Sequence, residues 1–157
     1  MNHLINRQNY IQQLEKLKDK HIIKVITGLR RSGKSTLLEI FVHQIKAMGV
    51  SSNHIQQYNF EKPIFPENYT WLDIYKEMLA KTDKENMNYI FLDEPQQIRE
   101  FERLIDALYV EKYIDLYVTG SNAHFLSSDL ATLLSGRYIT IHVLPFSFDE
   151  YIECQRN

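Results

Sequence analysis

The stretch "GLRRSGKST", Gly28 to Thr36, decides the fold. It matches the pattern G-x-x-x-x-G-K-[ST], with the strand-like run "HIIKVIT" (21–27) before it and a helix-like segment (35–49) after it. The glycines let the backbone curl so that successive N–H groups face a phosphate, and the helix adds its positive amino-terminal end. The stretch predicts a nucleotide-binding loop in which Lys34 reaches the β- and γ-phosphates and the Ser35 hydroxyl is placed on Mg²⁺. The residues expected to hold the nucleotide are Gly28, Leu29, Arg30, Arg31, Ser32, Gly33, Lys34, Ser35 and Thr36.

Strand-like and helix-like patterns alternate along the whole chain. Apolar, β-branched runs predict strands, and apolar residues at helical spacing predict helices. The alternation indicates an α/β fold, a three-layer sandwich with a mainly parallel five-stranded sheet and helices on both faces. The expected strands are 21–27, 54–60, 89–92, 114–120 and 138–144, and the expected helices are 9–20, 35–49, 71–81, 99–112 and 128–136.

Two adjacent acids end one of these strands, in "YIFLDEPQQ" (89–97). Four apolar residues precede them, as in a central strand of a parallel sheet, and open α/β sheets bind ligands at the carboxyl ends of such strands. A phosphate-binding loop needs a carboxylate nearby to hold Mg²⁺, and Asp93 stands where that role demands. Glu94, one residue on, is then placed to orient and deprotonate the attacking water.

Composition narrows the class and the location. The chain has 157 residues, a formal net charge of −2 and a single cysteine, Cys154. This length suits one domain, and the charge gives no bulk basic surface for nucleic acid. The polar opening lacks a signal-peptide pattern and no apolar run approaches the ~18 residues of a membrane span, so we expect a cytoplasmic protein without membrane contact. We interpret the basic stretch Lys16, Lys18, Lys20 and Lys24 as a solvated helix face.

Several nucleotide-binding classes are excluded by what surrounds the two motifs. An ABC-type signature would have to precede the Asp-Glu pair, whereas "LLSGR" (133–137) follows it. A GTPase would show D-x-x-G at Asp93 and an N-K-x-D motif, and both are absent. A small-molecule kinase usually lacks the hydrolytic glutamate and carries an arginine-rich lid, which we do not find. The remaining class has an Asp-Glu strand followed by one more strand that ends in polar residues, here "YVTGSNAHF" (117–125).

Four stretches together resemble the AAA-type domain of a large family of prokaryotic ATPases, similar to the archaeal-type ATPases. They are "GLRRSGKSTLL", "YIFLDEPQQ", "TGSNAHFLSSDLATLLSGRY" and "VLPFSFDEYI", and the resemblance runs from about Arg7 to Ile152. Pro95 departs from the family, which more often has an aliphatic residue there. The family normally continues into a carboxy-terminal domain of unknown function, so we expect that domain to be missing from a chain that stops at Asn157.

The resemblance implies a layout for the site. Its strand order would be 5-1-4-3-2, with the sensor strand (114–120) between the loop strand and the Asp-Glu strand. The tip of the sensor strand, Thr119, Ser121 or Asn122, would contact the γ-phosphate or the attacking water. Asn59 would hydrogen-bond Glu94 and hold it away from the water. Arg137 would complete a neighbouring chain's site, pair locally with an acid such as Asp129, or cap its helix. The expected organisation is an amino-terminal helix in 1–20, the ATPase domain in 21–153 and a tail in 154–157.

The expected function is Mg²⁺-dependent binding of ATP and its hydrolysis to ADP. Three uses of that chemistry stay open at this point: a hydrolysing motor or remodeller, a nucleotide-dependent switch without turnover, and the ATPase part of a DNA-handling protein. A homo-oligomer is compatible with all three. Nucleic acid would be contacted only through the absent carboxy-terminal region, because the chain itself is close to neutral.

Overall fold

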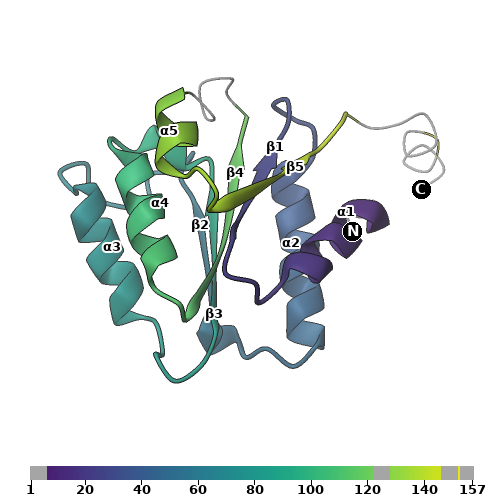
Figure 1. Ribbon diagram of the computed structural model, residues 1–157, viewed down its shortest axis with the longest axis horizontal. Helices are drawn as coiled ribbons and strands as arrows, with labels where there is room; N and C mark the ends of the chain where they lie inside the picture. Colours follow the sequence, from purple (N-terminus) through teal and green to yellow (C-terminus); the bar gives the residue numbers. More distant parts are fainter. Residues whose placement is uncertain (1–6, 122–127, 146–151, 153–157) are drawn as a thin grey trace.

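Five parallel strands form one sheet in the computed structural model, which describes residues 7–121, 128–145 and 152 (Figure 1). Their order is β2-β3-β4-β1-β5, and every neighbouring pair is parallel. This confirms the α/β class and the expected order 5-1-4-3-2. The strands are β1 (Ile23–Thr27), β2 (Ile55–Asn59), β3 (Asn88–Asp93), β4 (Ile114–Gly120) and β5 (Tyr138–His142).

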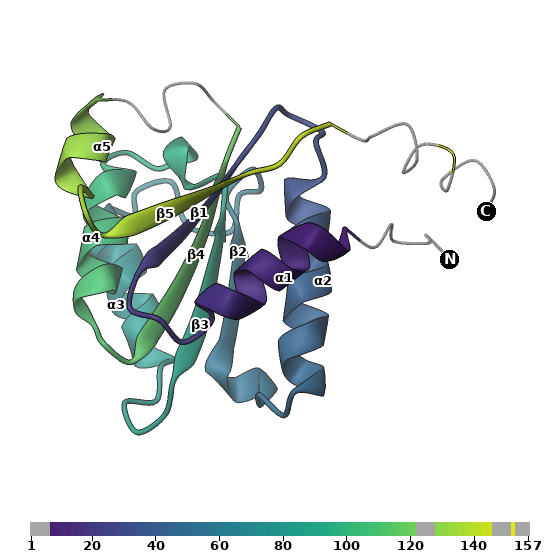
Figure 2. The ribbon, with the colours of Figure 1, turned by 45° about the vertical axis from the view of Figure 1, so that its right-hand side comes forward.

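Helices cover both faces of the sheet. On one face α1 lies against α2, and on the other α3, α4 and α5 lie side by side (Figures 1 and 2). No helix among the described residues combines the length and the apolar character that a bilayer crossing requires. The helices are α1 (Gln8–Leu17), α2 (Lys34–Ala47), α3 (Trp71–Ala80), α4 (Phe101–Val110) and α5 (Ser128–Leu133), with short 3₁₀ turns η1 (Ser52–His54) and η2 (Pro95–Gln97).

The central strands feed two separate apolar cores. Successive side chains of a strand point to opposite faces, so Leu116 and Val118 of β4 join the core under α3 and α4, while Tyr117 joins the core under α1 and α2. β3 divides in the same way, with Leu92 in the first core and Phe91 in the second. Burial on both faces explains why these strands read as nearly continuous apolar runs in the sequence.

Most element boundaries differ from the expected ones by one to three residues, and two of these differences can be traced to local structure. The helix expected from residue 99 begins at Phe101, because Glu100 has φ of 60° and cannot continue a right-handed turn. The last strand ends at His142 instead of 144. Val143 still donates its N–H to the Thr27 carbonyl at 2.7 Å, and its own carbonyl lies against Gly28 in the loop that follows β1.

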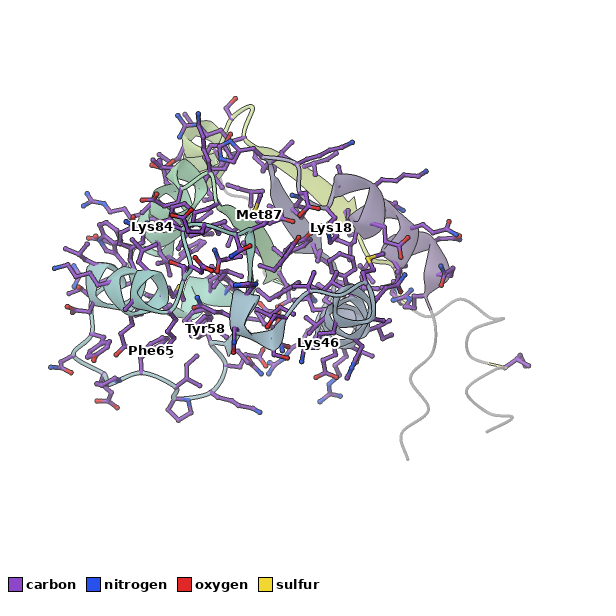
Figure 3. The ribbon with its side chains drawn as sticks, turned by 90° about the horizontal axis from the view of Figure 1, so that it is seen from below. Lys18, Lys46, Tyr58, Phe65, Lys84 and Met87 are labelled. Carbon is purple, nitrogen blue, oxygen red and sulfur yellow. The ribbon has the colours of Figure 1, made fainter. Side chains whose placement is uncertain are left out.

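A polar cluster lies within the sheet at the amino-terminal ends of its strands, the edge seen in Figure 3, where Lys18 and Met87 are labelled. We call it the amino-edge cluster, and it corrects one expectation: Lys24 lies in β1 and is fully buried, so it is not part of a solvated helix face. Its ammonium contacts the Asp115 carboxylate and donates to the Lys20 carbonyl at 2.6 Å. Burial lowers the pKa of Lys24 and raises the pKa of Asp115, against their mutual attraction. The members of the amino-edge cluster are Asp19, Lys24, Tyr89, Asp115 and Tyr117.

Candidate active site

The loop between β1 and α2 has the backbone of an anion cradle. Gly28 has no room for a side chain, since a Cβ there would lie 2.5 Å from the Val143 carbonyl oxygen. Gly33, with φ of 92°, forms the N-cap of α2, and no side chain caps this helix end. The Ser32 hydroxyl is buried and has no hydrogen-bond partner within the described part of the chain. A helix amino terminus without a side-chain cap and an unused hydroxyl are groups that fit a phosphate.

Lys34 is held inside this loop by its own backbone. Its ammonium donates to the carbonyl oxygens of Gly28 at 3.0 Å and Leu29 at 2.9 Å, and it lies 4.0 Å from Oε1 of Glu94. Burial lowers the pKa of this ammonium, and the carboxylates of Glu94 and Asp93 oppose that shift. The charge therefore points toward Asp93 at the end of β3 and Glu94 just after it, without forming a close ion pair with either.

Asp93 sits between two hydroxyl groups. The Ser35 hydroxyl donates to Oδ2 at 2.7 Å, and the Thr119 hydroxyl donates to Oδ1 at 2.5 Å. The β3–β4 register creates the second contact, because it places Asp93 beside Thr119. The hydroxyl and carboxylate oxygens at this position are hard ligands of the kind that Mg²⁺ prefers. The expected pair of metal-holding residues, Ser35 and Asp93, is thus brought together.

Glu94 directly follows β3 and turns away from it. Its φ of 56° is left-handed, and its N–H donates to the Thr119 hydroxyl at 3.1 Å. Its carboxylate oxygen Oε2 accepts from the Ser121 N–H at 3.2 Å and from the Gln96 side-chain amide. The side chain is only 6% exposed, yet it borders a polar cavity of about 440 Å³. That cavity is lined by Arg30, Glu61, Glu94, Gln96, Gln97 and Ser121.

We call the group at this sheet edge the carboxyl-edge cluster: Lys34, Ser35, Asp93, Glu94 and Thr119. It combines a buried cation, a hydroxyl–carboxylate pair and a second acid beside a cavity. These groups can neutralise phosphate charge, hold a divalent ion and accept a proton from water. Pocket sizes of a few hundred Å³ are usual for small-molecule sites.

Other residues expected at the site fall elsewhere. Asn59 does not reach Glu94, because its side chain accepts from the Glu61 N–H at 3.1 Å and Glu94 turns toward β4 on the opposite side of β3; that expectation is wrong for this structure. Asn122 lies outside the described residues. Arg137 pairs with Asp106 of α4 at 2.7 Å, and this local ion pair differs from the one suggested with Asp129, whose side chain is not described.

Two contributors to the site were missed by the sequence analysis. Gln96 follows Glu94 in η2, and its amide reaches back to the carboxylate. Arg7, ahead of α1, donates to the Ser32 carbonyl at 2.7 Å. The "Asp-Glu-Pro-Gln" spacing suggests a turn that could return Gln96 to Glu94, but no local pattern indicates a contact between Arg7 and a loop 25 positions away.

Fold and loop define a P-loop nucleotide-binding domain. The sequence profile described as "AAA domain" matches residues 20–152, and this chain belongs to that family. An uncharacterized protein of Haemophilus influenzae is 39% identical over 160 residues, a match covering 97% of this chain and 38% of that protein. An uncharacterized protein of Methanocaldococcus jannaschii is 30% identical over 132 residues, covering 83% and 28%. The chain thus spans well under half the length of these relatives.

Solved structures agree on the fold. The Walker-type ATPase of Pyrococcus abyssi aligns with a TM-score of 0.62 at 17% identity, covering 97% of this chain and 57% of that one. Hsp104 of S. cerevisiae, solved in complex with casein, aligns with a TM-score of 0.71 at 12% identity, covering 98% and 29%. Identities this low show the shared fold alone.

Proposed function

We propose that this chain binds Mg-ATP at the carboxyl-edge cluster and hydrolyses its β–γ phosphoanhydride bond. The observation that carries the proposal is the position of Asp93, whose two carboxylate oxygens are joined by hydrogen bonds to Ser35 after the loop and to Thr119 on β4. That arrangement connects the loop, the Asp-Glu strand and the sensor strand at a single sheet edge. Family membership and the fold support nucleotide binding in general.

Binding roles follow from the groups that the loop presents. The phosphates would lie against the amides of residues 28–36 and the open amino terminus of α2, with the Lys34 charge beside them. Ser35 and Asp93 would hold the Mg²⁺ ion. Bound Mg-ATP supplies an electrophilic phosphorus atom and an ADP leaving group.

Glu94 is the proposed base. Ser121 and Gln96 both donate to its Oε2, which leaves Oε1 as the oxygen that faces the Lys34 side of the site. A carboxylate oxygen held in this way can accept the proton of a water molecule that attacks the terminal phosphate. Ser121 and Asn122 are the proposed polar contacts to that phosphate or water, and Arg137 is proposed either as a local surface pair or as a contributor to a neighbouring chain's site.

What the ATP cycle drives would depend on the parts of the longer relatives that this chain does not cover. We propose that nucleotide state is coupled to the part of those relatives outside the matched segment, with a homo-oligomer and nucleic-acid contact through that part as further proposals. A switch that binds ATP without turnover would use the same loop and metal residues. It would differ only in that Glu94 would not act as a base.

Phosphate release from ATP tests the proposal. We expect slow turnover that requires Mg²⁺ and is abolished by EDTA, because the ion must neutralise charge on the phosphates. Asp93→Asn should weaken the Mg²⁺ dependence of ATP binding, while Glu85→Gln, at an exposed acid in the turn before β3, serves as the control. Tight ATP binding without phosphate release at any protein concentration would favour the switch instead.

A further inference from the structure

We propose that Arg7 is a positioning residue for the nucleotide, which shapes the phosphate-binding loop from behind. This inference rests on the proposed function, because it concerns how the loop is prepared for ATP. Arg7 precedes α1 and lies outside the segment that the AAA-domain profile matches, residues 20–152. Its hydrogen bonds to backbone carbonyls go to Ser32 and Leu144, which are not members of the carboxyl-edge cluster.

The guanidinium group of Arg7 bridges two backbone segments. Nη1 donates to the Ser32 carbonyl at 2.7 Å and Nη2 donates to the Leu144 carbonyl at 2.7 Å. The residue is only 6% exposed although it carries a full charge. The planar fork of an arginine suits such a double contact, because its donors have fixed directions. Arg7 thus ties the loop to the segment that follows β5.

Peptide geometry turns this contact into an effect on the nucleotide. In a planar trans peptide the C=O and the following N–H point in opposite directions. Holding the Ser32 carbonyl toward Arg7 therefore directs the Gly33 N–H to the other side, where the loop encloses its ligand. A phosphate-binding concavity needs its amides turned inward together, and Arg7 fixes one of them.

Tyr10 keeps Arg7 in this position. The guanidinium carbon lies 4.7 Å from the centre of the Tyr10 ring, within the range of a cation–π contact. The Tyr10 hydroxyl accepts from the Leu144 N–H at 3.1 Å. The first turn of α1 therefore holds Leu144 through both of its backbone groups, and the preceding Val143 carbonyl closes against Gly28.

The test compares Arg7→Met and Arg7→Lys with the parent chain and with Arg103→Met, a control at a 64% exposed arginine on α4. Calorimetric titration with Mg-ATP should show affinity reduced by roughly 10- to 100-fold in Arg7→Met, the size expected for a lost hydrogen bond from a charged donor. Arg7→Lys keeps the charge but lacks the planar fork of donors, so its affinity for Mg-ATP should lie between that of Arg7→Met and that of the parent chain. Arg103→Met should bind like the parent.

A second readout needs no nucleotide. Hydrogen exchange of the segment 28–36 should be faster in Arg7→Met than in the parent, while the amides of β3 and β4 keep their protection. A purely structural role would lower the urea midpoint yet leave the ATP affinity of the folded chain unchanged. Parent-like affinity in both Arg7 variants would overturn this inference alone. No ATP binding by the parent would overturn the proposed function and this inference with it.

Discussion

The two ends of the same three strands carry similar residues and behave differently. Each edge of β1, β3 and β4 holds a lysine beside aspartate or glutamate. In the amino-edge cluster Lys24 contacts Asp115 directly, and both side chains are at most 1% exposed. In the carboxyl-edge cluster Lys34 stays 4.0 Å from Glu94, which borders a cavity of about 440 Å³. A buried pair must stay intact for the fold, because losing one partner leaves an unpaired buried charge, whereas charges kept apart beside open space are available to a ligand.

The amino-edge cluster should be required for stability and irrelevant to chemistry. Lys24→Met leaves the Asp115 carboxylate buried without its partner, which should cost about 3–5 kcal/mol of unfolding free energy. Urea unfolding measures the loss, with Lys16→Met on the exposed face of α1 as the control. The double variant Lys24→Met/Asp115→Leu should recover much of it, since no unpaired charge remains. A loss below about 1 kcal/mol in Lys24→Met would contradict the importance of the pair.

The carboxyl-edge cluster should be required for chemistry and not for stability. Glu94→Gln removes the proposed base but leaves Ser35 and Asp93 in place, so turnover should fall by about 100-fold or more while Mg-ATP affinity is retained. That factor corresponds to about 2.7 kcal/mol in the activation barrier. Steady-state phosphate release gives the rate and calorimetry gives the affinity. Parent-like turnover in Glu94→Gln would remove this residue from the mechanism.

A milder change sharpens the contrast at the amino edge. Tyr117→Phe deletes a hydroxyl that donates to Asp115 at 2.8 Å, without leaving a cavity. A hydrogen bond to a buried charge contributes about 2 kcal/mol, and we expect a stability loss of that size by urea unfolding. Turnover per folded chain should not change. If turnover falls while stability holds, the two edges are coupled and the contrast is wrong.

The smallest expected effect concerns Arg137, which lies outside both clusters. Its ion pair with Asp106 is at the surface, with the arginine side chain 44% exposed. Such pairs contribute at most about 1 kcal/mol, so Arg137→Ala should alter stability little and should not alter turnover in a dilute solution of single chains. Turnover that rises with protein concentration in the parent, and fails to rise in Arg137→Ala, would assign this arginine to a neighbouring chain's site.

The parts of the site that the sequence predicted are those encoded by adjacent residues. The loop residues 28–36 and the Asp93–Glu94 pair are contiguous, and their context of strand and helix is visible in the apolar pattern. The sheet order followed from the family resemblance and was confirmed. Contacts between distant residues were missed, because no local pattern encodes them: Lys24 meets Asp115 across 91 positions and Arg7 meets Leu144 across 137.

One wrong expectation has a backbone cause. Asn59 was expected beside Glu94, since β2 and β3 are neighbours in the sheet. The register does bring Asn59 next to Asp93, but the left-handed conformation of Glu94 carries its carboxylate toward Ser121, just after β4, instead. Positive φ at a non-glycine residue is uncommon, and the sequence "LDEPQ" contains no pattern that predicts it.

We propose that the carboxyl-edge cluster, and not the amino-edge cluster, receives Mg-ATP. Calorimetric titration of Mg-ATP into the parent, Lys34→Ala and Tyr117→Phe tests it most directly, because each variant alters one edge. We predict saturable binding by the parent and by folded Tyr117→Phe, and affinity reduced at least about 100-fold in Lys34→Ala, which loses a full charge beside the phosphates. Unchanged affinity in a folded Lys34→Ala chain would contradict the claim.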